Sequence, residues 1–135
     1  MGPDLIVVDT NVIAHFALNG TLKEKTFKLL KTDGEWAVPI LWKSEFRNVL
    51  ALYLRKKNLT LTEALEIIEF VENKLRLVEY NVNSTQVLEL VNISICSAYD
   101  CEFVALAKQL NVRLVTADKQ LLKEFPKNTL ALQKV

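Results

Sequence analysis

The stretch LIVVDTN, residues 5–11, decides the fold. An apolar, mostly β-branched run ends abruptly in Asp9, Thr10 and Asn11, a pattern that predicts a buried strand followed by a turn. The stretch RLVTAD, residues 113–118, repeats the arrangement and places Asp118 after a second short strand. Ligands of open parallel sheets bind outside the carboxyl ends of the strands. We therefore expect Asp9 and Asp118 at one ligand-binding edge of a sheet.

Two further carboxylates lie between these motifs. Glu45 is part of KSEFRNVL, residues 43–50, in the first turns of a helix expected after Pro39, and Asp100 is part of SAYDCEFVALA, residues 97–107. If the fold brings all four together, their mutual repulsion makes the cluster costly without a cation. Ligands that are all oxygen atoms suit Mg²⁺ or Mn²⁺. The pattern predicts metal-dependent hydrolysis of phosphodiesters.

Each carboxylate also has a structural interpretation. Asp9 could turn the chain after its strand, Asp118 could cap the last short helix, and Asp100 fits a capping box with Ser97. Glu45 could be an exposed helix residue. Taken singly, the structural interpretation is favoured for each; the occurrence of all four at strand ends and helix starts favours a common site.

Length and composition describe one ordinary globular domain, residues 1–135. Half of the residues are apolar and 24% are charged, and no apolar run approaches the roughly 20 residues that span a bilayer. The N-terminus lacks the basic and apolar segments of a secretory signal. We expect a cytoplasmic protein without a membrane segment.

Cysteine and histidine offer little further chemistry. Cys96 and Cys101 are expected to be reduced, half-buried side chains, because zinc would need more ligands and the single histidine, His15, is far away in sequence. His15 itself is expected to be an ordinary helix residue.

Charge is distributed unevenly. Residues 58–107 carry two basic and eight acidic residues, whereas the remainder carries 15 basic and eight acidic residues. Lysines and arginines gather at 23–31 and 43–57. This pattern is consistent with a face that attracts a polyanion or with ordinary solvated helix faces, and both interpretations stay open.

Periodicity predicts an α/β fold in which a parallel sheet is covered by helices on both faces. Thr21–Glu24 and Thr60–Glu63 both have the form of a capping box, and one apolar face of the second helix should include Leu61 and Leu65. The middle of the chain is richer in predicted helix than a simple alternation of strands and helices would be. This pattern predicts a helical hairpin beside the sheet. Strands are expected at 5–8, 36–38, 77–80, 114–116 and, as an edge strand, 130–132; helices at 12–18, from 21 to about 33, from about 41 to 54, from 61 to about 75, and at 83–95, 99–110 and 119–124.

The ordered set of motifs resembles PIN-domain ribonucleases, and among them the VapC toxins of prokaryotic toxin–antitoxin pairs. The motifs are VDTNVI at 8–13, SEF at 44–46, YDCEFVALA at 99–107 and LVTAD at 114–118. They span nearly the whole chain in the order that the family shows. Cys101 stands where the family more often has alanine, a change between small residues.

The resemblance implies a PIN-like three-layer sandwich with a short parallel sheet. It also implies that Asp9, Glu45, Asp100 and Asp118 bind Mg²⁺ or Mn²⁺ and carry catalysis. The resemblance places Thr10, Asn11 and Thr116 around the acidic pocket, where they could orient carboxylates or water. It further implies an RNA substrate, a homodimer, and a cognate antitoxin protein as partner.

Water is then the expected nucleophile, and cleavage would leave a 5′-phosphate and a 3′-hydroxyl. Lys43, Arg47 and Lys119 are sequence neighbours of the acidic motifs and could hold RNA phosphates, although solvated helix faces explain them equally well.

Two rival classes remain. A phosphotransfer domain or phosphatase can also carry an aspartate after its first strand, but haloacid-dehalogenase-type enzymes need a second aspartate where this chain has Asn11. A PIN-like module that has lost catalysis and only binds proteins would be expected to lack at least one of the four acidic residues.

Overall fold

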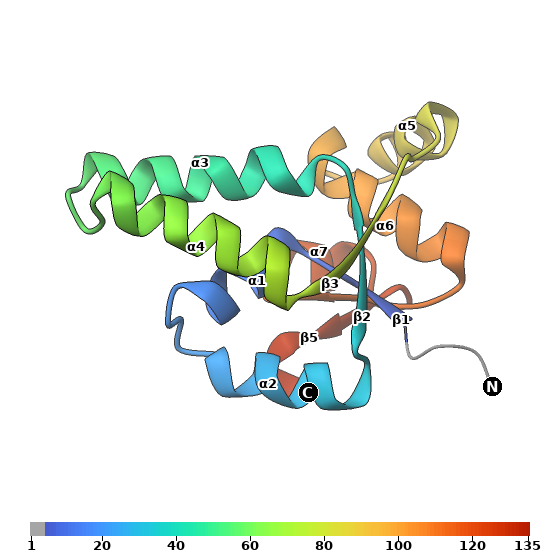
Figure 1. Ribbon diagram of the computed structural model, residues 1–135. Helices are drawn as coiled ribbons and strands as arrows, with labels where there is room; N and C mark the ends of the chain where they lie inside the picture. Colours follow the sequence, from blue (N-terminus) through green and yellow to red (C-terminus); the bar gives the residue numbers. More distant parts are fainter. Residues whose placement is uncertain (1–4) are drawn as a thin grey trace.

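One parallel sheet of five short strands organises the computed structural model, which describes residues 5–135 (Figure 1). The strand order is β3-β2-β1-β4-β5, and β1 lies at the centre with Ile6 opposite Trp36 and Val7 opposite Leu114. All pairings are parallel, which confirms the predicted α/β class. The strands are β1 Leu5–Val8, β2 Glu35–Pro39, β3 Arg76–Tyr80, β4 Leu114–Thr116 and β5 Thr129–Ala131.

Helices cover both faces of the sheet, so the predicted three-layer sandwich is confirmed (Figure 1). Crossovers between parallel strands are right-handed. The connections from β1 to β2 and from β2 to β3 therefore put α1–α4 on one face of the sheet. The connections from β3 to β4 and from β4 to β5 run in the opposite direction across the sheet and put α5–α7 on the other face. The contacts agree, since α1 packs on α3 and α4, whereas α6 packs on β1, β2 and β4. The helices are α1 Thr10–Ala17, α2 Lys23–Thr32, α3 Trp42–Arg55, α4 Leu61–Lys74, α5 Ser84–Asn92, α6 Ala98–Leu110 and α7 Lys119–Glu124, followed by a 3₁₀ turn at Leu132–Lys134.

The core lies between the central strand and the helices on its two sides. Val7 and Val8 of β1 are completely buried, as are Phe103 of α6 and Phe46 of α3. Burial on both faces explains why residues 5–8 form an unbroken apolar run rather than an alternating one. Cys96 and Cys101 are free, as expected, but they are buried rather than half-buried. Within residues 5–135 we find no helix with the length and apolar character needed to cross a membrane.

The predicted helical hairpin is confirmed: α3 and α4 lie side by side and reach past the edge of the sheet (Figure 1). The Thr60–Glu63 capping box is present, with both reciprocal hydrogen bonds. The predicted apolar face of α4 is partly wrong. Leu61 and Leu65 are 63% and 57% exposed, and burial concentrates at Ala64 and Val71. The reason is that the tip of the hairpin extends beyond the layer that would cover it.

The capping box predicted at Thr21–Glu24 is wrong. Helix α2 begins at Lys23 with Leu22, not Thr21, at its N-cap position, and no side chain caps it. The backbone N–H of Leu22 donates to Nδ1 of His15 at 3.4 Å. The same approach requires a glycine at position 20, where a Cβ would lie 2.1 Å from His15 Nδ1. His15 is a residue of α1, as expected, and it also binds the backbone N–H of the residue that precedes α2.

Several predicted boundaries shift by one to three residues, and small shifts are common at element ends. Helix α1 begins at Thr10 because Asp9 caps it, α5 ends at Asn92 rather than Ile95, and β5 covers Thr129–Ala131 rather than 130–132.

The two capping motifs allow a matched test. Thr60→Ala should lower the free energy of unfolding by about 1 kcal/mol, because it removes a formed N-cap. Thr21→Ala should change the free energy of unfolding by much less. Urea unfolding of both variants beside the parent protein measures the difference, and equal losses would contradict the assignment of the caps.

Candidate active site

The site lies where the chain direction across the sheet reverses. β1 and β4 are neighbours, but the connections that follow them go to opposite faces of the sheet, and such a switch point opens a crevice at the carboxyl ends of the strands. Asp9 follows β1 and Asp118 follows β4. Each caps the next helix: Asp9 Oδ1 accepts from Thr10 N at 2.8 Å, and Asp118 Oδ1 accepts from Gln120 N at 2.8 Å. The capping interpretation is correct for Asp118, and Asp9, expected only to turn the chain, is a cap as well. Capping does not exclude a site, since each residue has a second carboxylate oxygen.

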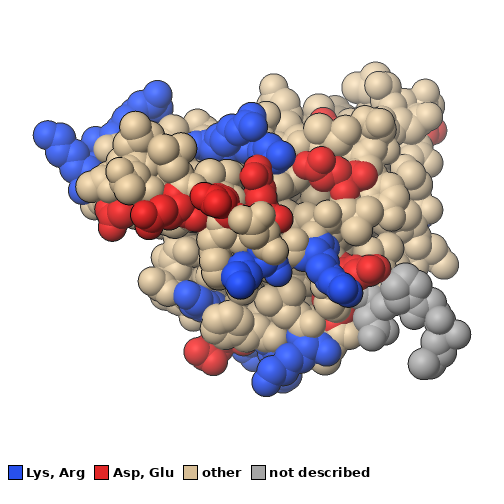
Figure 2. Space-filling view, viewed as in Figure 1, with Lys and Arg blue, Asp and Glu red and all other residues tan. Residues whose placement is uncertain are grey.

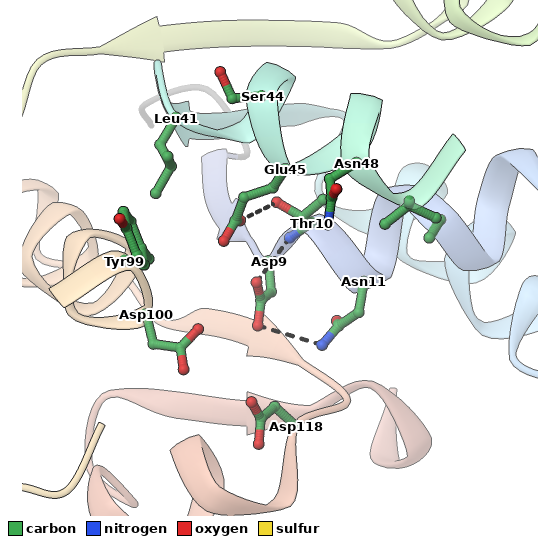
Figure 3. A pocket seen from close by; sticks show the side chains of 12 residues that line it. Asp9, Thr10, Asn11, Leu41, Ser44, Glu45, Asn48, Tyr99, Asp100 and Asp118 are labelled. Carbon is green, nitrogen blue, oxygen red and sulfur yellow. Dashed lines mark hydrogen bonds between the residues drawn. The ribbon is translucent and has the colours of Figure 1, made fainter. Parts of the chain in front are cut away.

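The four predicted carboxylates line one open pocket of about 470 Å³. Asp9 and Asp118 come from the strand ends, Glu45 from the first turns of α3, and Asp100 from the first turn of α6. Figure 3 shows their side chains directed toward a common space. We call this space the acidic pocket.

Hydroxyl and amide groups hold the carboxylates in place. Thr116 Oγ1 donates to Asp9 Oδ2 at 2.7 Å, and Thr10 Oγ1 donates to Glu45 Oε1 at 2.7 Å. Asn11 Nδ2 lies 3.3 Å from Asp9 Oδ2, and its Oδ1 accepts from the backbone N–H of Ala117 at 3.2 Å. Thr10, Asn11 and Thr116 therefore connect β1, α3 and β4 around the acidic pocket.

Burial and like charge oppose ionisation here. Burial raises the pKa of Asp9 to about 7, although the Thr116 hydroxyl opposes the shift, and the charges of Asp100 and Glu45 add to it. The pKa of Glu45 is raised for the same main reason, burial, with smaller contributions from Asp100 and Glu102. Burial and the neighbouring Asp118 raise the pKa of Asp100. The lining residues include no lysine or arginine, so no cationic side chain in the pocket wall offsets these charges.

The donor set fits a hard divalent cation, because it consists of carboxylate oxygens and because a cation would relieve their repulsion. The arrangement is open: within residues 5–135, no three acidic, cysteine or histidine side chains stand close enough together to enclose an ion. The side chains would have to turn toward the ion to complete its ligand shell.

The lysine and arginine side chains predicted to bind phosphate do not line the acidic pocket. Lys43 and Arg47 each lie two residues from Glu45 on α3, about 200° around the helix, and so face away from the pocket. Lys43 Nζ pairs with Glu72 Oε1 at 3.3 Å. Lys119 is exposed at the start of α7, outside the pocket. Phosphate binding by these three residues remains a prediction, and the structure does not bring them to the acidic residues.

The structure adds pocket residues that sequence reasoning missed. Leu41, Ser44, Asn48 and Val49 line the acidic pocket from α3, and the 62% exposed Tyr99 lies on its rim near Leu41 (Figure 3). Helical spacing from Glu45 could have found Leu41, Asn48 and Val49, because residues three or four apart share a helix face.

A family model described as PIN domain matches residues 6–128. The chain belongs to the PIN domain family, as its motifs predict. A search of curated proteins finds no match.

Solved structures show the same fold. PAE2754 from Pyrobaculum aerophilum is 20% identical with a TM-score of 0.76, and the match covers 97% of this chain and 86% of that protein. FitAcB from Neisseria gonorrhoeae is 17% identical with a TM-score of 0.73, covering 96% and 99%. VapBC2 from Rickettsia felis, bound to a DNA fragment from its promoter, is 11% identical with a TM-score of 0.68, covering 94% and 98%.

The raised pKa of Asp9 predicts how stability depends on pH. An unfolded aspartate loses its proton near its ordinary pKa of 3.8, whereas folded Asp9 keeps it to about 7. Between these values the folded state binds more protons, so the stability of the metal-free protein should fall as pH rises. In chelator, the wild type should be more stable at pH 5 than at pH 8, by on the order of 2 kcal/mol.

The Asp9→Asn substitution should remove much of the difference in stability between pH 5 and pH 8. Asp33→Asn, at the opposite edge of the sheet, is the matched control and should retain it. The measurement is chemical unfolding at both pH values. A wild type that is equally stable at pH 5 and pH 8 would contradict a buried, protonated Asp9.

Proposed function

We propose that this protein is a nuclease that uses Mg²⁺ or Mn²⁺ to hydrolyse phosphodiester bonds of RNA. The observation that carries the proposal is the convergence of Asp9, Glu45, Asp100 and Asp118 on one pocket at the switch point of the sheet. Membership of the PIN domain family supports it.

Each carboxylate has a place in this chemistry. Asp9, the most buried, would anchor a cation from the floor of the pocket, while Glu45, Asp100 and Asp118 would complete its ligands from three other elements. A bound Mg²⁺ or Mn²⁺ activates water as a nucleophile and neutralises charge that develops on the phosphate and the leaving oxygen. Thr10 and Thr116 would keep Glu45 and Asp9 oriented, because each already donates to the carboxylate that it positions.

The other side chains that could act as a nucleophile or base are poorly suited. Burial raises the pKa of the Cys96 thiol to about 11 and raises that of Cys101 as well, so neither is a ready thiolate. His15 lies outside the acidic pocket and accepts a backbone hydrogen bond. We propose water rather than a protein side chain as the nucleophile, and the products should then carry a 5′-phosphate and a 3′-hydroxyl.

A toxin–antitoxin context is the second part of the proposal. Among the solved structures with this fold are a toxin–antitoxin complex from Klebsiella pneumoniae, 13% identical with a TM-score of 0.67, and VapBC2. This likeness supports an antitoxin partner. We propose a cytoplasmic toxin that acts on RNA, forms a homodimer and is held inactive by a cognate antitoxin protein.

Replacing any one of the four carboxylates by its amide should abolish cleavage of structured RNA in Mg²⁺ or Mn²⁺, because the amide removes an anionic ligand and keeps the side-chain shape. The variants are Asp9→Asn, Glu45→Gln, Asp100→Asn and Asp118→Asn. Gel assays should show loss of at least about 100-fold, on the scale of lost metal-site interactions. Asp33→Asn should cleave like the wild type.

Two results of the same assay would contradict the mechanism. Full activity in excess chelator would exclude the metal, and a 2′,3′-cyclic phosphate on the product would show that the RNA hydroxyl, not water, attacks.

Expression of the protein alone should slow bacterial growth, whereas the Asp9→Asn variant should be harmless at equal abundance. Growth curves with immunoblots to match protein levels test this. Arrest by the variant would favour a module that acts only through protein contacts.

A further inference from the structure

A second pocket adjoins the acidic pocket at the same edge of the sheet. It has a volume of about 360 Å³ and lies between the end of β3, the start of α5, α6 and the connection from β2 to α3. Figure 1 shows these segments meeting beside the first turn of α3. We call it the side pocket. It contains none of the four carboxylates of the acidic pocket.

A narrow ridge separates the two pockets. Ile40 lines the side pocket and Leu41, the next residue, lines the acidic pocket. The ridge is fixed, because Ile40 N donates to the carbonyl oxygen of Tyr80 at 3.2 Å. Asp100 and Glu102 flank it in the same way from α6, with Asp100 in the acidic pocket and Glu102 in the side pocket. A strand whose phosphate lies at the acidic residues can therefore place a neighbouring nucleotide over the ridge.

The lining of the side pocket has the two properties that recognise an unpaired base. Tyr80 is half-buried and Ile40 is 51% exposed. Both side chains offer apolar surface on which the face of a base can stack. The Asn81 amide, Ser84 hydroxyl and Glu102 carboxylate offer hydrogen bonds for its edge. None of these three side chains takes part in a hydrogen bond or ion pair in the described part of the chain. Single-stranded RNA is read by this combination of stacking and edge contacts.

Resting on the proposed nuclease function, we propose that the side pocket binds one unpaired base next to the scissile phosphate and that Glu102 selects guanine. An ionised carboxylate only accepts hydrogen bonds. Guanine presents two adjacent N–H donors, from N1 and N2, to such an acceptor. Uracil presents a single N–H between two carbonyl oxygens, which a carboxylate repels.

The test is the sequence preference of cleavage rather than its rate. Wild-type protein is given a pool of RNAs with a randomised loop in Mg²⁺, and the cut sites are mapped by sequencing. Guanine should be enriched at one fixed position beside the cut. Glu102→Gln should reduce this enrichment about tenfold, the scale of one lost two-point base contact. Glu89→Gln, an exposed glutamate of α5 outside the side pocket, should keep it.

A uniform change of rate with the same preference would overturn the proposal. It would mean that Glu102 acts only through its charge on Glu45, the interaction that contributes to the raised pKa of Glu45. An unchanged RNA preference in a Glu102→Gln variant that no longer binds its antitoxin would assign the side pocket to a protein partner instead.

A binding measurement separates this proposal from the nuclease proposal. In the Asp9→Asn background, fluorescence anisotropy should show about tenfold tighter binding of a tetranucleotide with one guanine than of tetrauridine, and Glu102→Gln should abolish the difference. If the preference in binding is present and the wild type cuts no RNA, the nuclease proposal fails and the base pocket stands. If the wild type cuts RNA without a base preference at any fixed position, the base pocket is wrong.

Discussion

The carboxylate of Asp9 is held at a place where burial opposes its charge. It lies at the end of the central strand, only 6% exposed, and its oxygens accept from the backbone of Thr10 and from the hydroxyl of Thr116. These hydrogen bonds stabilise the ionised form, yet burial outweighs them and the pKa rises to about 7. A group poised in this way responds strongly to a nearby cation, because the cation favours the ionised form.

The remainder of the site is organised around this constraint. The Thr116 hydroxyl also accepts from the backbone N–H of Asp118 at 3.0 Å, so the same side chain fixes both strand-end aspartates. Thr10 provides the corresponding link to Glu45 on α3. Three elements that are distant in sequence are therefore connected through short polar side chains. The site is arranged at the expense of some stability in the metal-free protein, which is common at functional sites.

Much of this arrangement could be predicted from the sequence, because it follows from where strands end. Asp9 and Asp118 both follow apolar runs, and in a parallel sheet all such ends meet at one edge. The position of Lys43 and Arg47 could not be read from their nearness to Glu45 in the chain. Two residues along a helix reverse the direction of a side chain, so both face away from the acidic pocket. Sequence also could not show that His15 binds the backbone of Leu22 before α2, since that contact depends on the turn at Gly20.

In the proposed mechanism, the connection between β2 and α3 relates catalysis to specificity. It begins α3, which positions Glu45, and it is bonded to the end of β3 through Ile40 and Tyr80. Both pockets thus share one rigid wall, and a nucleotide held in the side pocket would fix where its neighbouring phosphate meets the acidic residues. Positioning of this kind contributes to the rate of cleavage as well as to selectivity, because a small displacement of the reacting phosphate lowers the rate of the chemical step. Such positioning matters in a site whose lining has no lysine or arginine, because no side chain of the pocket wall carries positive charge to hold the substrate.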